Sequence, residues 1–96
     1  MKNRFKIQIW ILNQLLTSGG LTYQELRSKW SECSLNDRKS ILAKRTFETY
    51  RREIEETFDI DIICDASHNY QYRVDRINDI VNDKIKMWLL SINLNC

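Results

Sequence analysis

The spacing of the apolar residues changes from helical to alternating directly after Asp59. Before that point, apolar side chains recur every three or four positions, which is the pattern of helices with one buried face. From Ile60 to Val74, apolar and polar residues alternate, which is the pattern of strands with one buried face. A chain of 96 residues is long enough for one core of modest size. We therefore expect an α+β fold, mainly α-helical, in which a β-hairpin follows a group of helices.

Two short helices joined by a glycine turn are predicted in the first third of the chain. Residues 3–17 carry an apolar stripe at helical spacing: Phe5, Ile9, Leu12 and Leu16. The chain's two glycines follow directly and suit the positive φ angles of a helix end. Thr22 and Glu25 match the capping box, in which each side chain accepts a hydrogen bond from the other residue's amide. A second helix therefore begins there and ends near Cys33.

A third helix and the hairpin are predicted next, after an irregular segment. The helix covers about residues 44–58, and one sector of its helical wheel holds the apolar residues Phe47, Ile54 and Phe58. In the strands that follow, the alternation places Tyr70 and Tyr72 in the core rather than on the surface as platforms for base stacking. Residues 66–69 form the expected hairpin loop, in which Asn69 suits a positive φ.

A last apolar stripe at helical spacing, over residues 77–92, predicts a fourth helix. We therefore divide the chain into a domain of residues 1–75 and a linker or dimerisation helix within residues 76–96. The stripe can pack on the first helix of the same chain or on its copy in a second subunit, and we favour the homodimer.

The charges of the chain are unevenly distributed, although its formal net charge is only +2. Residues 38–52 hold six cationic side chains and one acid, a net charge of +5. Residues 53–83 hold nine acids and two cations, a net charge of −7. A basic cluster of this size is what binding to a phosphate backbone requires, but on its own it is equally consistent with a solvated face.

The order of elements favours DNA binding. Three helices, the third basic at its start, followed by a β-hairpin, form the order of a winged helix-turn-helix. We therefore expect the third helix to enter the major groove of double-stranded DNA and the loop at 66–69 to act as a wing. The residues assigned to base contacts are Arg45, Thr46, Thr49 and Arg52. Those assigned to phosphate contacts are Thr22, Tyr23, Arg38, Lys39, Lys44 and Arg51, of which Arg51 lies nearest the buried side, and those assigned to the wing are Ser67, His68 and Asn69.

Other function classes find little support in the sequence. Cys64 and His68 are two candidate ligands where a structural zinc site requires four, so we expect no metal. Ser67 and His68 near Asp65 would lie exposed and splayed on the hairpin tip, and no glycine-rich phosphate loop is present, so we expect neither an enzyme nor a cofactor. The alternative that we keep is a winged-helix protein-interaction module that uses the apolar C-terminal helix.

The location of the protein is predicted from its apolar runs and its cysteines. The longest apolar run covers only residues 9–12, and the N-terminus is polar, so we expect no membrane span and a cytoplasmic protein. Cys33, Cys64 and Cys96 are spaced by 31 and 32 positions, which favours neither a disulfide framework nor a metal knuckle. We expect these cysteines to be reduced.

Several segments resemble the N-terminal winged-helix domain of WYL-domain transcriptional regulators of the type found in Bacteroidetes. They are Arg4 to Leu16, Gly20 to Leu26, the box Lys44-Arg45-Thr46-Phe47 and the run Ile54 to Ile62. The resemblance covers most of residues 3–92 and implies that the box opens the recognition helix and that residues 60–74 form the wing. It also implies that the last helix leads to a WYL effector domain, which is missing from this chain. The chain departs from this family in having no proline before the box.

Overall fold

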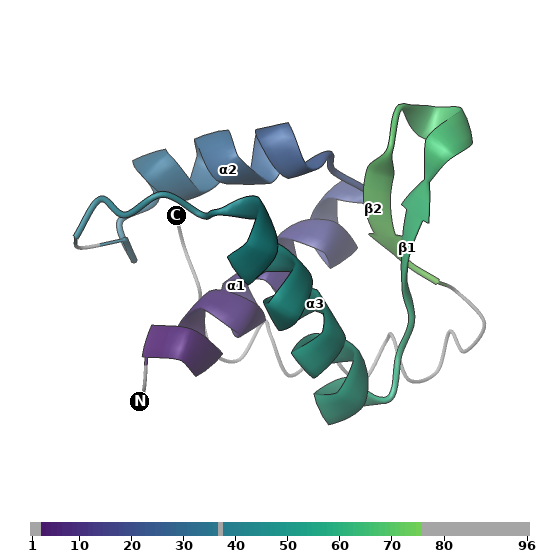
Figure 1. The fold of residues 1–96 in the computed structure, drawn as a ribbon, viewed down its shortest axis with the longest axis horizontal. Coiled ribbons are helices and arrows are strands. Elements are labelled where there is room, and N and C mark those ends of the chain that lie inside the picture. Colours follow the sequence, from purple (N-terminus) through teal and green to yellow (C-terminus); the bar gives the residue numbers. More distant parts are fainter. Residues whose placement is uncertain (1–2, 37, 76–96) are drawn as a thin grey trace.

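The computed structural model describes residues 3–36 and 38–75 (Figure 1). Its elements follow in the order α1 (Asn3–Ser18), α2 (Tyr23–Glu32), α3 (Lys44–Phe58), β1 (Ile62–Asp65), the short 3-10 turn η1 (Ala66–His68) and β2 (Gln71–Val74). The expected α+β class, mainly α-helical with a hairpin after the helices, is confirmed for these residues. The predicted helix over residues 77–92, and the predicted boundary at residue 76, lie outside the described residues.

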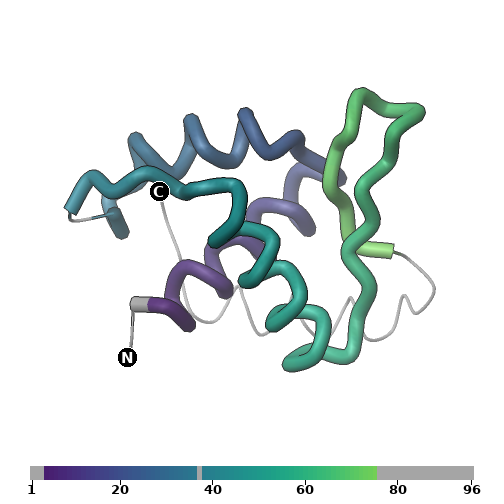
Figure 2. The backbone as a smooth tube through the Cα atoms, viewed as in Figure 1, coloured from purple at the N-terminus to yellow at the C-terminus, as the bar shows by residue number. Residues whose placement is uncertain are grey.

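The hairpin stands beside the helices and is tied to them through the backbone. In the view of Figure 1 and Figure 2, α3 crosses in front of α1, and α2 runs above the start of α3. β1 and β2 are antiparallel, with Ile62 opposite Val74. The amide of Leu21 donates to the carbonyl of Tyr72 over 3.0 Å, and the amide of Tyr72 donates to the carbonyl of Leu21 over 2.7 Å. β2 is therefore bonded both to β1 and to the segment before α2.

The turn between α1 and α2 has the glycines and the cap that the sequence predicts. Gly19 and Gly20 have φ angles of 79° and 145°, which side chains with a Cβ rarely adopt. A Cβ at Gly20 would also come within 3.2 Å of the side-chain oxygen of Gln71 on β2. In the capping box, Thr22 Oγ1 accepts from the Glu25 amide over 3.1 Å, and Glu25 Oε1 accepts from the Thr22 amide over 3.0 Å. The start of α2 is thus fixed by its own sequence.

The core lies between α1, α2, α3 and the hairpin. Trp10 of α1 packs against Trp30 of α2 with 5.0 Å between ring centroids, and Phe47 of α3 meets the Tyr72 ring edge-on at 4.7 Å. Further buried apolar residues complete it: Ile9, Ile11, Leu12, Leu15, Leu21, Leu26, Leu42, Ile54, Ile62 and Val74. The prediction that Phe5 joins this core is wrong, because it lies in the first turns of α1, where its side chain is 38% exposed.

Side-chain hydrogen bonds link α1 to α3. Arg4 donates two hydrogen bonds to the carboxylate of Glu53, and Gln8 Nε2 donates to Glu53 Oε1 over 2.8 Å. Gln8 is itself buried, so its amide needs such a partner. Glu53, in the second half of α3, is therefore engaged with α1.

The hairpin loop is longer than predicted. It comprises η1 and two residues in the left-handed conformation, Asn69 with φ 60° and Tyr70 with φ 61°, and the Tyr70 amide donates to the carbonyl of Asp65 over 2.9 Å. Asn69 has the positive φ that was predicted, and Tyr72 is buried as predicted. The prediction that Tyr70 lies in the core is wrong: strand pairing resumes only at Gln71, and Tyr70 is 64% exposed.

Two further expectations concern membranes and cysteines. None of the helices in the described part of the chain is long and apolar enough to cross a membrane. Cys33, at the end of α2, is buried and disulfide-bonded, whereas Cys64 of β1 carries a free thiol. The expectation of reduced cysteines is therefore wrong for Cys33.

Candidate nucleic-acid interface

α3 turns its basic first half away from the core. Phe47 and Ile54 face inward and are fully buried. The residues predicted to contact bases lie on the outward side of the same helix: Arg45, Thr46, Thr49 and Arg52. All of them are exposed except Thr49, which is half-buried and donates its hydroxyl to the carbonyl of Arg45 over 3.1 Å. One helix thus presents all the predicted base-contact side chains together.

The start of α3 is unusually positive for a helix terminus. Its N-cap, Ala43, makes no side-chain hydrogen bond to the first turn, and that turn contains no acidic residue. Lys44 and Arg45 stand there instead, at the positive end of the helix dipole. This arrangement weakens the helix end, where a carboxylate would be stabilising, and it favours an anion brought from outside.

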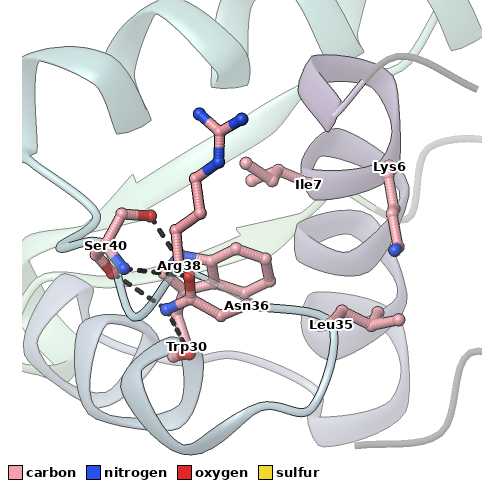
Figure 3. Close-up of a pocket in the computed structure, with 7 residues that line it drawn as sticks. All are labelled: Lys6, Ile7, Trp30, Leu35, Asn36, Arg38 and Ser40. Carbon is pink, nitrogen blue, oxygen red and sulfur yellow. Dashed lines mark hydrogen bonds between the residues drawn. The ribbon is translucent and has the colours of Figure 1, made fainter.

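The loop before α3 holds two more predicted phosphate contacts. Arg38 and Lys39 are both exposed there, and Lys39 has a φ of 52°. The buried Asn36 fixes the loop: its Nδ2 donates to the carbonyls of Trp30 and Ser40, and its Oδ1 accepts from the Ser40 amide and hydroxyl. Figure 3 shows these bonds among residues that line a cavity of about 180 Å³, with the Arg38 side chain extending away from the bonds. The loop that carries both cations is therefore anchored by a buried amide.

Two residues of the predicted phosphate set, Lys44 and Arg51, belong to a hydrogen-bonded cluster that joins α3 to the hairpin. Lys44 Nζ donates to the Tyr72 hydroxyl over 2.6 Å, and that hydroxyl donates to Glu48 Oε1 over 2.7 Å. Arg51 Nη1 donates to Glu48 Oε2 over 3.0 Å, and Arg51 Nε and Nη2 both donate to the carbonyl of Ile62 on β1. We call Lys44, Glu48, Arg51 and Tyr72 the latch, because together they hold both strands to one helix.

The electrostatics of the latch follow from its geometry. Burial alone would raise the pKa of Glu48, but the hydrogen bond from Tyr72 and the charges of Arg51 and Lys44 outweigh it and hold that pKa below 4.5. Burial and the neighbouring Glu48 carboxylate raise the pKa of Tyr72 above its usual range. The latch therefore contains two cations and one carboxylate at neutral pH, a net charge of +1.

The two cations of the latch differ in what remains accessible. The Arg51 side chain is only 24% exposed, and its guanidinium is occupied by Glu48 and by the backbone of β1. The Lys44 side chain is 55% exposed, and its ammonium lies 4.9 Å from the Tyr23 ring centroid and 4.8 Å from that of Tyr72. Lys44 thus keeps donors for a ligand, whereas Arg51 is committed to the fold.

The start of α2, where Thr22 and Tyr23 were predicted to contact phosphate, is also engaged internally. Thr22 Oγ1 accepts the capping hydrogen bond from the Glu25 amide. The Tyr23 hydroxyl donates to the carbonyl of Leu42 over 2.6 Å, which ties α2 to the segment before α3. The polar side-chain atom of Thr22 therefore stabilises the start of α2, and that of Tyr23 stabilises the junction between α2 and α3.

The tip of the wing carries Asp65, Ser67 and His68 in mutual contact. Ser67 donates from its amide and its hydroxyl to Asp65 Oδ1, over 3.0 and 2.6 Å, and His68 Nδ1 lies 2.7 Å from Asp65 Oδ2. The hydrogen bonds from Ser67, followed by that from His68, lower the pKa of Asp65 to about 2. Ser67 and His68 are exposed as predicted, but they are not splayed: the half-buried Asp65 acts as the cap of η1 and orders the loop.

Two exposed apolar side chains near this surface were not predicted. Ile41, just before α3, is 68% exposed, and Tyr70 in the wing loop is 64% exposed. The signal for Tyr70 was present in the sequence, because a loop with a Ser-His-Asn segment after an aspartate favours a turn with left-handed residues. The alternation of apolar residues pointed to a strand instead.

The comparisons with known proteins and the metal chemistry can now be stated. No family model, no curated protein and no solved structure matches the chain. Within residues 3–36 and 38–75, no three His, Cys, Asp or Glu side chains gather in a group suited to a metal ion. The site is therefore interpreted from its own geometry.

Proposed function

We propose that this chain is a winged helix-turn-helix domain that binds double-stranded DNA in a sequence-specific manner, as the DNA-binding module of a cytoplasmic transcriptional regulator. α3 enters the major groove and the hairpin serves as the wing. The resemblance of the Lys44 to Phe47 box to WYL-domain regulators agrees with this proposal, and a WYL effector domain is then the partner that the module serves.

The outward face of α3 carries the proposal. Arg45 and Arg52 are exposed there, and neither side chain forms a hydrogen bond or ion pair with another residue in the described ranges. The other cations of α3, Lys44 and Arg51, take part in the latch, so these two arginines are the cations of α3 with all their donors free for base edges or phosphates. An arginine in the major groove donates two hydrogen bonds to a guanine, which discriminates that base by about 1–3 kcal/mol.

The size of the module sets a limit on its affinity. One domain of this kind buries a small interface, so tight binding to DNA requires two copies or tandem modules. We propose a homodimer that reads two half-sites separated by whole helical turns. Its predicted contact, the helix over residues 77–92, lies outside the described part of the chain.

Selection from a random duplex library, repeated over a series of salt concentrations, tests the proposal. The wild-type chain is expected to enrich one motif, with an affinity that falls linearly with salt on a logarithmic scale. Arg45→Ala is expected to lose about 5- to 150-fold in affinity for that motif and to relax its selection at one position. Lys29→Ala, which removes an exposed cation from α2, is the matched control and should keep the motif.

Two results would contradict the proposal. If the wild-type chain enriches no motif even at low salt, DNA reading by this chain is wrong. If Arg45→Ala and Lys29→Ala weaken binding equally and leave the motif unchanged, Arg45 reads no base and the assignment of base contacts to this face of α3 is wrong.

A further inference from the structure

A cleft of about 480 Å³ lies where α2, α3 and the wing meet. The first turn of α2 contributes Gln24, the first residue of α3 contributes Lys44, and the wing loop contributes Asn69 and Tyr70. Lys44 is followed by Arg45, so the cleft adjoins the surface that we assign to base contacts. It brings one cation and one exposed aromatic ring to the same hollow.

Tyr70 is held in this position by an uncommon backbone. It follows Asn69, and both residues are in the left-handed region, with φ angles of 60° and 61°. A bulky side chain is rarely found there, because its Cβ crowds the backbone. The Tyr70 amide donates to Asp65, and its carbonyl accepts from the Cys64 thiol over 3.8 Å, so the loop fixes this conformation.

Packing of the Tyr70 ring against the described residues does not offset this strain. Its side chain is 64% exposed, and its ring is in no aromatic pair of the kind that joins Phe47 to Tyr72. Backbone strain that does not stabilise the fold is often found at functional sites, so we infer a binding role for Tyr70. The ring lines the cleft, so its role is sought there.

Lys44 supplies the charge of the cleft. Its ammonium is fixed by the Tyr72 hydroxyl and by two aromatic faces, and its remaining donors are open because half of the side chain is exposed. Lys44 Nζ lies 3.8 Å from Glu48 Oε1, but that carboxylate is shared with Arg51, so the latch keeps a net charge of +1 beside the cleft. A fixed cation with open donors is suited to an anionic oxygen.

We propose that this cleft seats one sugar–phosphate unit of duplex DNA, on the strand that runs from the α3 surface toward the wing. Lys44 Nζ binds the phosphate, and the Tyr70 ring packs against the neighbouring deoxyribose. This inference rests on the proposed function, and it adds a contact that fixes the position of the domain on DNA without reading sequence. Charge complementarity and continuity with the Arg45 surface identify DNA as the occupant.

Three variants of the full chain test the proposal on the motif selected by wild type. Tyr70→Ala keeps the Cβ and is expected to weaken binding about 5-fold or more at every sequence, which corresponds to about 1 kcal/mol. Tyr70→Phe keeps the ring and is expected to bind as wild type. Lys44→Gln is expected to reduce the slope of log affinity against log salt by about 0.9, the value for one phosphate contact.

Hydroxyl-radical footprinting locates the contact. Wild type and Tyr70→Phe should protect one backbone position beside the motif, and Tyr70→Ala should lose that protection while keeping the motif itself. Because Lys44 belongs to the latch, circular dichroism checks that Lys44→Gln folds. If Lys44→Gln does not fold, the comparison of Tyr70→Ala with Tyr70→Phe decides whether the cleft contacts DNA.

Each outcome separates this proposal from the broader one. If Tyr70→Ala binds and protects DNA as wild type does, the cleft is not a DNA contact, although base reading by α3 stands. If Tyr70→Ala loses binding only to single-stranded DNA, the ring stacks on an unpaired base and the duplex proposal is overturned. If the wild-type chain binds no duplex at all, both proposals are wrong.

Discussion

The latch between α3 and the wing offers the sharpest test of how this fold holds together. Tyr72→Phe keeps the ring, which is buried edge-on against Phe47, and removes only the hydroxyl. That hydroxyl accepts from Lys44 over 2.6 Å and donates to Glu48 over 2.7 Å. The substitution therefore deletes two hydrogen bonds to charged groups without creating a cavity of any size.

The expected cost is worked from those two bonds. A hydrogen bond to a charged group contributes about 1.5–3 kcal/mol. Both partners retain other interactions, since Glu48 keeps Arg51 and half of the Lys44 side chain is in solvent. We therefore expect Tyr72→Phe to lower the free energy of unfolding by about 2 kcal/mol, which for a domain of this size corresponds to roughly 8–16 °C in Tm.

Urea unfolding followed by tryptophan fluorescence measures this cost, because the buried indoles of Trp10 and Trp30 report on the core. Tyr70→Phe is the matched control: it removes an exposed hydroxyl that has no partner among the described residues, and its unfolding free energy should stay within about 0.5 kcal/mol of wild type. A loss in Tyr72→Phe no larger than that of the control would refute the latch as a stabilising element.

The pH dependence gives the same prediction an independent check. The pKa of Glu48 is lowered in the fold, so its contribution is present above its unfolded value and is lost as pH falls through the folded one. The pKa of Tyr72 is raised, so its contribution is present below about 10 and is lost as pH rises above that value. The difference between wild type and Tyr72→Phe should therefore be largest between about pH 5 and pH 10 and should shrink on both sides.

Two further predictions concern the loop before α3 and the wing loop after β1. Asn36→Ala removes a buried amide that makes four hydrogen bonds, one with the carbonyl of Trp30 and three with Ser40, and should cost about 2–3 kcal/mol in urea unfolding. A cost below 0.5 kcal/mol would show that the loop carrying Arg38 is held by other contacts. Asp65→Asn should lower Tm at neutral pH, and the gap to wild type should close as pH falls from 3.8 toward 2, because the pKa of Asp65 is depressed to about 2. A gap that persists unchanged at pH 2 would contradict the role of the carboxylate in capping η1.

The parts of the fold that were predicted correctly are those whose causes are local in sequence. Thr22 and Glu25 are three residues apart, and their capping box depends only on each other. The glycine turn and the buried positions Phe47 and Ile54 likewise follow from spacing within a single turn or helix. Such features need no knowledge of the tertiary structure.

The errors arose where one local pattern competed with another. The alternation through Tyr70 and Tyr72 indicated a strand, but the Asp65 side chain and carbonyl organise a turn that takes in Tyr70 as well. One added loop residue removes Tyr70 from the pleat, although Tyr72 keeps its buried position. At the other end, Phe5 fitted the helical stripe, but too little of the described fold covers the first turns of α1 to bury it.

The latch could not be predicted from the sequence, and it changes how the basic cluster is interpreted. Lys44 and Tyr72 are 28 positions apart, so their bond depends on the docking of the hairpin onto α3. The charge of +5 over residues 38–52 counts every cation equally, but the structure divides them by role. The Arg51 guanidinium donates to the backbone of β1, and the Lys44 ammonium donates one hydrogen bond to the Tyr72 hydroxyl.

This division accounts for how a domain with so small a net charge can still present a positive surface in one place. Three acids of the second half are held within the fold: Glu53 bonds to α1, Glu55 accepts from the Ile62 amide, and Asp65 caps the wing turn. Each of these carboxylates is used where it stabilises the fold. The outward face of α3 carries Arg45 and Arg52, whose charges are unpaired within the described residues and open to an external anion.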